Sequence, residues 1–96
     1  MWARVAAFEG GDNERLRQAN EERMAAGGMG MPQGISKVMV LSDAGGVKRL
    51  FITFFESREA IEAAEPAFEQ MGSDIPEEIR GKRTSVDVYE VVFQRG

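Results

Sequence analysis

Apolar side chains occupy both faces of one predicted strand, over about residues 47–56. Side chains alternate between the two faces of a strand. One face of this strand carries Leu50, Ile52 and Phe54, and the other carries Phe51, Thr53 and Phe55. A strand that is apolar on both faces needs cover on both sides, and about two helices can cover only one. We therefore expect another copy of the chain or a bound ligand to bury the second face of the sheet.

Three further strands are predicted, over residues 2–9, 35–41 and 84–93, because turn residues bound each of these apolar segments. A hairpin turn over residues 42–46 joins two of the strands, and its glycines permit positive φ angles. Four glycines and a proline over residues 27–34 predict a loop.

Two helices are predicted between these strands. The first begins at Asp12 or Asn13, both suitable N-caps, and runs to about Met24. The second begins after Ser57 and keeps apolar residues at a helical period. Because Pro66 interrupts it, we expect a kink or two short helices there. A further single turn over residues 74–81 precedes the last strand.

The predicted order of elements is β-α-β-β-α-β, the α+β ferredoxin-like arrangement, formed by one domain over residues 1–96. Right-handed crossovers place both helices on one face of a four-stranded antiparallel sheet. We expect Phe51, Thr53 and Phe55 on the other face, with one of the two alternating sets of the first strand. An apolar face of this size marks an interface or a ligand site, and a face-to-face homodimer is the simplest assembly.

The amino-acid composition limits the kinds of catalysis and ligand binding that the chain can perform. The chain has no cysteine and no histidine, which removes thiol nucleophiles, the commonest general base and the main zinc and haem ligands. We therefore expect no metal and no cofactor. A net charge of −4 disfavours nucleic acid as a partner. No apolar run reaches the ~18 residues of a membrane span and no signal peptide is recognisable, so we expect no membrane partner and a cytoplasmic location.

Three segments carry a family resemblance. They are Met1-Trp2-Ala3-Arg4-Val5, Phe55-Glu56-Ser57-Arg58-Glu59-Ala60 and Val88-Tyr89-Glu90-Val91. With them the chain resembles the dimeric α+β barrel superfamily, and within it the small antibiotic biosynthesis monooxygenase-like proteins, over nearly its whole length. The resemblance implies a homodimer in which two sheets pack face to face. It also implies a pocket in each subunit, between the sheet and the helices or loops.

The resemblance also suggests an activity. Members include cofactor-independent monooxygenases that act on polycyclic phenols, haem-degrading enzymes and small isomerases, and the catalytic branches use Asn, Trp and sometimes His or Arg. In this chain Phe55 stands where Trp is usual, His is absent, and the two asparagines, Asn13 and Asn20, lie in the first helix. The resemblance therefore implies a monooxygenase-like protein without the usual catalytic residues. The alternative is a non-catalytic small-molecule-binding or assembly module.

Five residues form the candidate pocket for a hydrophobic or aromatic small molecule: Arg4, Phe51, Thr53, Phe55 and Tyr89. Arg4 either binds an anionic or phenolate substrate or forms a structural ion pair with Asp87 or Glu90 of the last strand.

The aromatic candidates have two interpretations as well. Tyr89 either orients a substrate carbonyl or packs its ring and sends its hydroxyl to solvent. Phe51 and Phe55 either stack on a planar ligand or form the dimer core. The loop over residues 27–34, with its flexible methionines, is either a lid or a plain connection.

An RNA-recognition domain has the same order of elements. Its third-strand signature requires a basic residue, then glycine, an aromatic residue and a further small residue. The corresponding segment Arg49-Leu50-Phe51-Ile52 lacks both small residues, which ranks this interpretation last.

Overall fold

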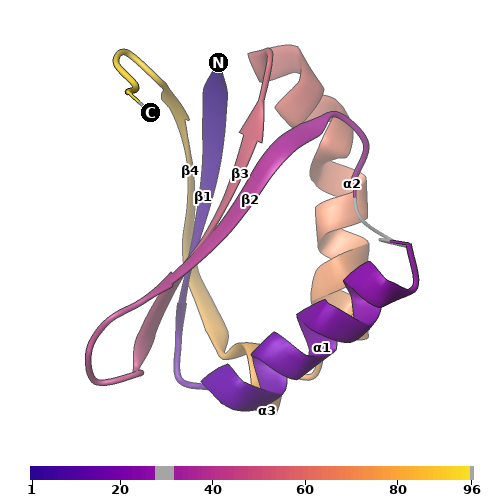
Figure 1. The fold of residues 1–96 in the computed structure, drawn as a ribbon, viewed down its shortest axis with the longest axis vertical. Coiled ribbons are helices and arrows are strands. Elements are labelled where there is room, and N and C mark those ends of the chain that lie inside the picture. The colour runs from indigo at the N-terminus through magenta and orange to yellow at the C-terminus, as the bar shows by residue number, and fades with distance from the viewer. Residues whose placement is uncertain (28–31, 96) are drawn as a thin grey trace.

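A computed structural model describes residues 1–27 and 32–95 of the chain. Its elements are β1 (Trp2–Glu9), α1 (Asn13–Ala25), β2 (Ile35–Ser42), β3 (Lys48–Phe55), α2 (Arg58–Asp74), α3 (Glu77–Arg80) and β4 (Lys82–Glu90). This order confirms the predicted ferredoxin-like α+β fold. Figure 1 shows α1 and α2 on the same side of a twisted sheet, with α3 at one end.

The four strands form one antiparallel sheet in the order β2-β3-β1-β4. Arg4 in the centre of β1 lies opposite Thr53 of β3 and Val88 of β4. The β1–β4 register shifts between Ala7 and Phe8, so the end of β1 and the start of β4 are offset by one residue.

The prediction that Phe51, Thr53 and Phe55 of β3 lie on the face away from the helices is wrong. Phe55 is fully buried against α2, in a cluster with Ile61, Ala64, Phe68 and Met71. Phe51 packs on the edge of this cluster, and Thr53 lies on the same side of the strand by alternation. Because both faces of β3 are apolar, alternation could show that there were two sets but not which one met the helix.

The other face of the sheet carries the alternate side chains of the strands. Strand register places eight apolar residues there: Ala3, Val5, Ala7, Met39, Leu41, Leu50, Ile52 and Phe54. Neither helix covers this face (Figure 1). Its rim is exposed, and Leu41 and Leu50 show 45% and 38% of their surface to solvent.

Helix α2 continues through Pro66, so the expectation of two short helices is wrong. The helix begins at Ser57, whose side chain accepts a hydrogen bond from the backbone N–H of Ala60 (3.1 Å). The buried residues Ile61, Ala64, Phe68 and Met71 keep their helical spacing on both sides of the proline. Packing of this continuous stripe offsets the backbone hydrogen bond that proline cannot form.

Helix α1 is held differently, because it has no buried residue. It begins with the cap Asp12, whose carboxylate accepts from the backbone N–H of Arg15 (3.0 Å). Its contacts are mainly with α3 rather than with the sheet. Helix α1 therefore stands away from the sheet, and space is left beneath it.

Two glycines join the end of β1 to the start of β4 by backbone contact. Gly11 and Gly81 have φ angles of +81° and +82°. A Cβ atom at Gly81 would lie 2.6 Å from the carbonyl oxygen of Glu9, and one at Gly11 would lie 2.6 Å from the backbone nitrogen of Gly81. This close approach fixes α3 beside the end of β1.

No helix within the described ranges, 1–27 and 32–95, is long and apolar enough to cross a membrane.

Candidate functional site

A cavity of about 500 Å³ lies between the sheet and the helices, in the space beneath α1. Side chains from all four strands and all three helices line it. Its apolar wall consists of Ala6, Phe8, Leu16, Val40, Phe51, Phe68, Met71 and Ile75. Ligand pockets generally have volumes of about 300–1,000 Å³, so this cavity is large enough for a small organic molecule.

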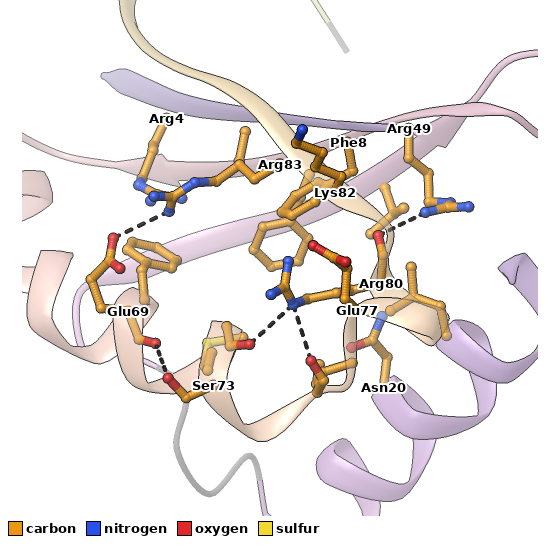
Figure 2. A pocket seen from close by; sticks show the side chains of 18 residues that line it. Arg4, Phe8, Asn20, Arg49, Glu69, Ser73, Glu77, Arg80, Lys82 and Arg83 are labelled. Atoms are coloured by element: carbon orange, nitrogen blue, oxygen red, sulfur yellow. Dashed lines mark hydrogen bonds and ion pairs between the residues drawn. The ribbon is translucent and has the colours of Figure 1, made fainter. Parts of the chain in front are cut away.

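The polar lining of the cavity is mainly cationic. Five basic residues reach it, Arg4, Arg49, Arg80, Lys82 and Arg83, against two carboxylates, Glu69 and Glu77. Figure 2 shows these side chains around the cavity. The chain as a whole carries a net charge of −4, so positive charge is concentrated here against the overall balance.

Arg4 is buried and paired. Only 2% of the residue is exposed, and its Nε donates to Glu65 Oε1 at 2.7 Å while Nη2 donates to Oε2 at 3.3 Å. The guanidinium carbon lies 3.9 Å from the centroid of the Phe68 ring, a cation–π contact.

The predicted structural ion pair of Arg4 therefore exists, but its predicted partners, Asp87 and Glu90, are wrong. Arg4 faces the helices and meets Glu65 of α2. Asp87 lies opposite Val5 in the strand register, so its side chain belongs to the face of the sheet away from Arg4. Glu90 lies opposite Trp2 and is therefore further along the strand than Arg4.

Arg49 is also buried, at 2% exposure, but its acceptors are neutral. It donates to the side-chain oxygen of Asn13, the carbonyl of Gly10 and the carbonyl of Arg80, the last at 2.9 Å. These bonds tie β3 to α1, to the end of β1 and to α3, and so close the base of the cavity.

Arg80 and Arg83 flank the start of β4. Arg80 Nε donates to the carbonyls of Gly72 and Ile75, both at 3.0 Å, and Nη1 donates to the carbonyl of Gly81 at 3.0 Å. Arg83 instead forms an ion pair with Glu69 (3.1 Å) between partly exposed side chains.

The structure brings together only part of the predicted pocket. Arg4 and Phe51 line the cavity. Thr53 and Phe55 share their face of the sheet but are fully buried outside the cavity lining. Tyr89 lies opposite Ala3, on the other face of the sheet, with 55% of its surface exposed. The prediction that Tyr89 belongs to the same pocket is therefore wrong.

Thr53 has a further property that the sequence did not suggest. Its hydroxyl oxygen is buried and has no hydrogen-bond partner among the described residues. A buried unsatisfied hydroxyl costs stability, so this position is a weak point of the core.

Several cavity residues were missed by the sequence analysis. Asn20 lines the cavity from α1, although its place in a polar helix gave no reason to select it. Arg80, Lys82 and Arg83 were also missed. The sequence did contain a feature that could have indicated them, because three cations within four residues are unusual in an acidic chain.

The lid hypothesis depends on Met29 and Met31, which lie outside the described residues. Within the part of the chain that the structure describes, no group of three or more His, Cys, Asp or Glu side chains is placed to hold a metal ion.

Comparison with known proteins gives structural matches only. No family model matches the sequence, and no curated protein matches it. Among solved structures, Rv0793 from Mycobacterium tuberculosis superimposes with a TM-score of 0.62 and 16% identity, over 99% of this chain and 98% of its own. A proposed antibiotic biosynthesis monooxygenase from Chloroflexus aurantiacus J-10-fl gives 0.61 and 14%, over 99% and 96%.

The chain has the fold of the antibiotic biosynthesis monooxygenase-like proteins. A variant of MhuD, with two manganese protoporphyrin IX molecules bound per active site, shares this fold at a TM-score of 0.60 and 17% identity, over 100% of this chain and 99% of its own. At such identities the likeness to the monooxygenase-like proteins shows a shared fold. This confirms, for the fold, the resemblance inferred from the sequence.

Proposed function

We propose that this protein binds an aromatic small molecule in the cavity beneath α1 and oxygenates it without a cofactor. The cavity itself carries the proposal, because it combines about 500 Å³ of space with an aromatic wall from Phe8, Phe51 and Phe68. The monooxygenase-like fold supports the reaction class. A porphyrin cofactor fits less well, since the chain has no histidine to ligate its metal.

The reaction would draw all its electrons from the substrate. An activated methylene flanked by aromatic rings loses a proton and gives an electron-rich carbanion or enolate. Dioxygen then takes four electrons from it, so that one oxygen atom becomes a carbonyl oxygen and the other leaves as water. The protein would supply a dry site and cations that stabilise the anion, a role for preorganised charges such as the buried Arg4.

A non-catalytic binding module is the second candidate, and two observations favour it. Arg4 already has Glu65 as its counter-ion, which reduces the charge it can offer to a substrate anion. Trp2, the only tryptophan, packs against the core cluster and is not part of the cavity lining.

We further propose that the chain forms a homodimer through the apolar face of the sheet that the helices leave uncovered. This assembly would bury Ile52, Phe54 and their neighbours, while the cavity of each subunit would lie on the opposite side of its sheet.

The test uses anthrone, an aromatic ketone with one activated methylene, and a variant that fills the cavity. Gly72 lines the cavity from α2, and a Cβ atom there would meet nothing within 4 Å. Gly72→Phe therefore adds a large side chain at the wall of the cavity, and its Cβ atom meets no backbone. Gln70→Phe, on the exposed surface of the same helix, is the matched control.

Oxygen uptake and anthraquinone formation are measured with each protein, and anthrone binding is measured separately under nitrogen. Activity that is retained in Gln70→Phe and lost in Gly72→Phe supports the oxygenase. Binding without oxygen uptake supports the non-catalytic module. Equal activity in both variants, or no binding by the unmodified protein, would contradict the proposal.

A further inference from the structure

Three cations at the α3 end of the cavity form no ion pair with a carboxylate of the described residues. Among the described residues, Arg4 and Arg83 have ion pairs with glutamates, whereas Arg49, Arg80 and Lys82 have none. The acceptors of Arg49 are an amide oxygen and two carbonyls, and those of Arg80 are three carbonyls. Their hydrogen bonds are satisfied in part, but their charge is not neutralised.

An unpaired charge is most unfavourable where water is excluded. Arg49 is 2% exposed, and Arg80 is half-buried. Removing a cation from water is costly unless an opposite charge is near, because the interaction between charges strengthens as the local dielectric falls. Glu77 is the one carboxylate of the cavity lining that comes from α3, against three cations around it. This end of the cavity therefore favours an added negative charge.

Two of these cations keep donor groups free within the described part of the chain. Figure 2 shows Arg80 and Glu77 together at the α3 end of the cavity, with Lys82 further along the cavity, beside Phe8. No acceptor within residues 1–27 and 32–95 takes a hydrogen bond from Nη2 of Arg80 or from Nζ of Lys82. Guanidinium and ammonium donors of this kind recognise oxyanions.

We propose that the ligand of this cavity carries an oxyanionic group that binds between Arg80 and Lys82, with its aromatic body against Phe8 and Phe51. Arg49 contributes through its charge from the base of the cavity and does not touch the ligand. This deepens the proposed function by naming a substrate class, aromatic organic anions, and it rests on that function only in using the same cavity. Binding of the anion requires no catalysis.

The first measurement compares two ligands of the same shape. Naphthalene-2-carboxylate carries the anion, and naphthalene-2-carboxamide is its neutral counterpart. Titration calorimetry with the unmodified protein is expected to give about tenfold tighter binding of the carboxylate. Equal binding of the two ligands, or tighter binding of the carboxamide, would overturn the proposal.

Charge-changing variants then locate the anion. Lys82→Gln is expected to weaken binding of the carboxylate about fivefold, and Glu77→Gln to strengthen it about threefold, because each changes the charge by one unit at the same end of the cavity. Neither variant should change the affinity for the carboxamide. Lys48→Gln, at the start of β3 and outside the cavity lining, is the matched control and should alter neither affinity.

All three changed side chains are exposed, so loss of the fold does not obscure the comparison. The proposal is overturned when Lys82→Gln and Lys48→Gln behave alike, or when the unmodified protein binds neither naphthalene. Failure of the oxygenase gives a separate result: anthrone is not oxidised, while carboxylate binding still depends on Lys82 and Glu77.

Discussion

Two buried arginines are stabilised here by different means. Arg4 has a carboxylate partner and an aromatic ring beneath it, whereas Arg49 has only neutral acceptors. Breaking a buried ion pair by removing one partner costs more than the pair contributes, because the remaining charge stays buried. The pair Arg4–Glu65 should therefore be sensitive to loss of the glutamate.

Glu65→Ala leaves the Arg4 guanidinium buried without a counter-ion. We expect the free energy of unfolding to fall by about 2–3 kcal/mol, less than for a fully buried pair because Glu65 is itself 40% exposed. Urea denaturation provides the measurement. Glu62→Ala, one turn earlier in α2 and in a long exposed pair with Arg58 (3.9 Å), should change stability by less than about 0.5 kcal/mol. Equal effects of the two substitutions would show that Arg4 does not depend on Glu65.

At the scale of elements, the hairpin between β2 and β3 depends on one carboxylate. Asp43 Oδ1 accepts hydrogen bonds from the backbone N–H groups of Val47 (2.9 Å) and Lys48 (3.1 Å). The hydrogen bond from the Lys48 backbone, followed by that from Val47, lowers the pKa of Asp43 below its ordinary value of 3.8. These bonds favour the ionised carboxylate, because it is the stronger acceptor.

A pKa that is lower in the folded chain has a definite consequence for pH dependence. The stabilisation of the hairpin is complete above the ordinary pKa of 3.8 and is lost as the pH falls below it, through the pKa of the folded state. Carboxyl chemical shifts should show Asp43 titrating below 3.8. The protection of the Val47 and Lys48 amides against exchange, relative to an unfolded chain at the same pH, should fall in acid. Asp43→Asn should remove this local pH dependence. A titration midpoint at or above 3.8 would contradict the expectation.

Local patterns predicted most of the elements correctly. Ser57 was predicted as a cap, and Asp12 was one of two candidate caps, because their side-chain oxygens can accept a backbone hydrogen bond at the start of a helix. A glycine such as Gly81 readily ends a helix. The choice between a kinked helix and two short helices at Pro66 could not be made in this way, because packing against the sheet outweighs a local penalty.

The candidate site was harder to predict. Arg4 could be selected because a cation in the middle of an apolar strand needs a partner, and Phe51 because it is a large aromatic side chain within a strand. The cations near α3 could not be placed, because the cavity joins residues that are far apart in sequence, such as Arg49 and Arg80. Tyr89 was misplaced because the sequence does not show which face of the sheet each strand position takes.

At the scale of the whole molecule, the sheet has one face under helices and one face bare. The bare face carries the central apolar residues Val5, Ile52 and Phe54, with Met39 and Leu41 toward one edge. A bare apolar surface of this kind favours association, and a closed twofold arrangement lets two identical faces cover each other.

Ile52→Asp places a charge in the middle of the bare face. We expect the unmodified protein to be a dimer by light scattering, and Ile52→Asp to be a folded monomer, because the charge would have to be buried at the interface. Ala63→Asp, on the exposed side of α2, is the matched control and should remain a dimer. A monomeric unmodified protein would disprove the face-to-face assembly.

The contact between Gly11 and Gly81 also has an evolutionary meaning. Any side chain at either position would collide with backbone, whereas the polar surface of α1 has no buried residue to preserve. Selection should therefore hold these two glycines fixed over long divergence, while most of α1 drifts. Such uneven constraint would allow two chains to share this fold at identities near 15%.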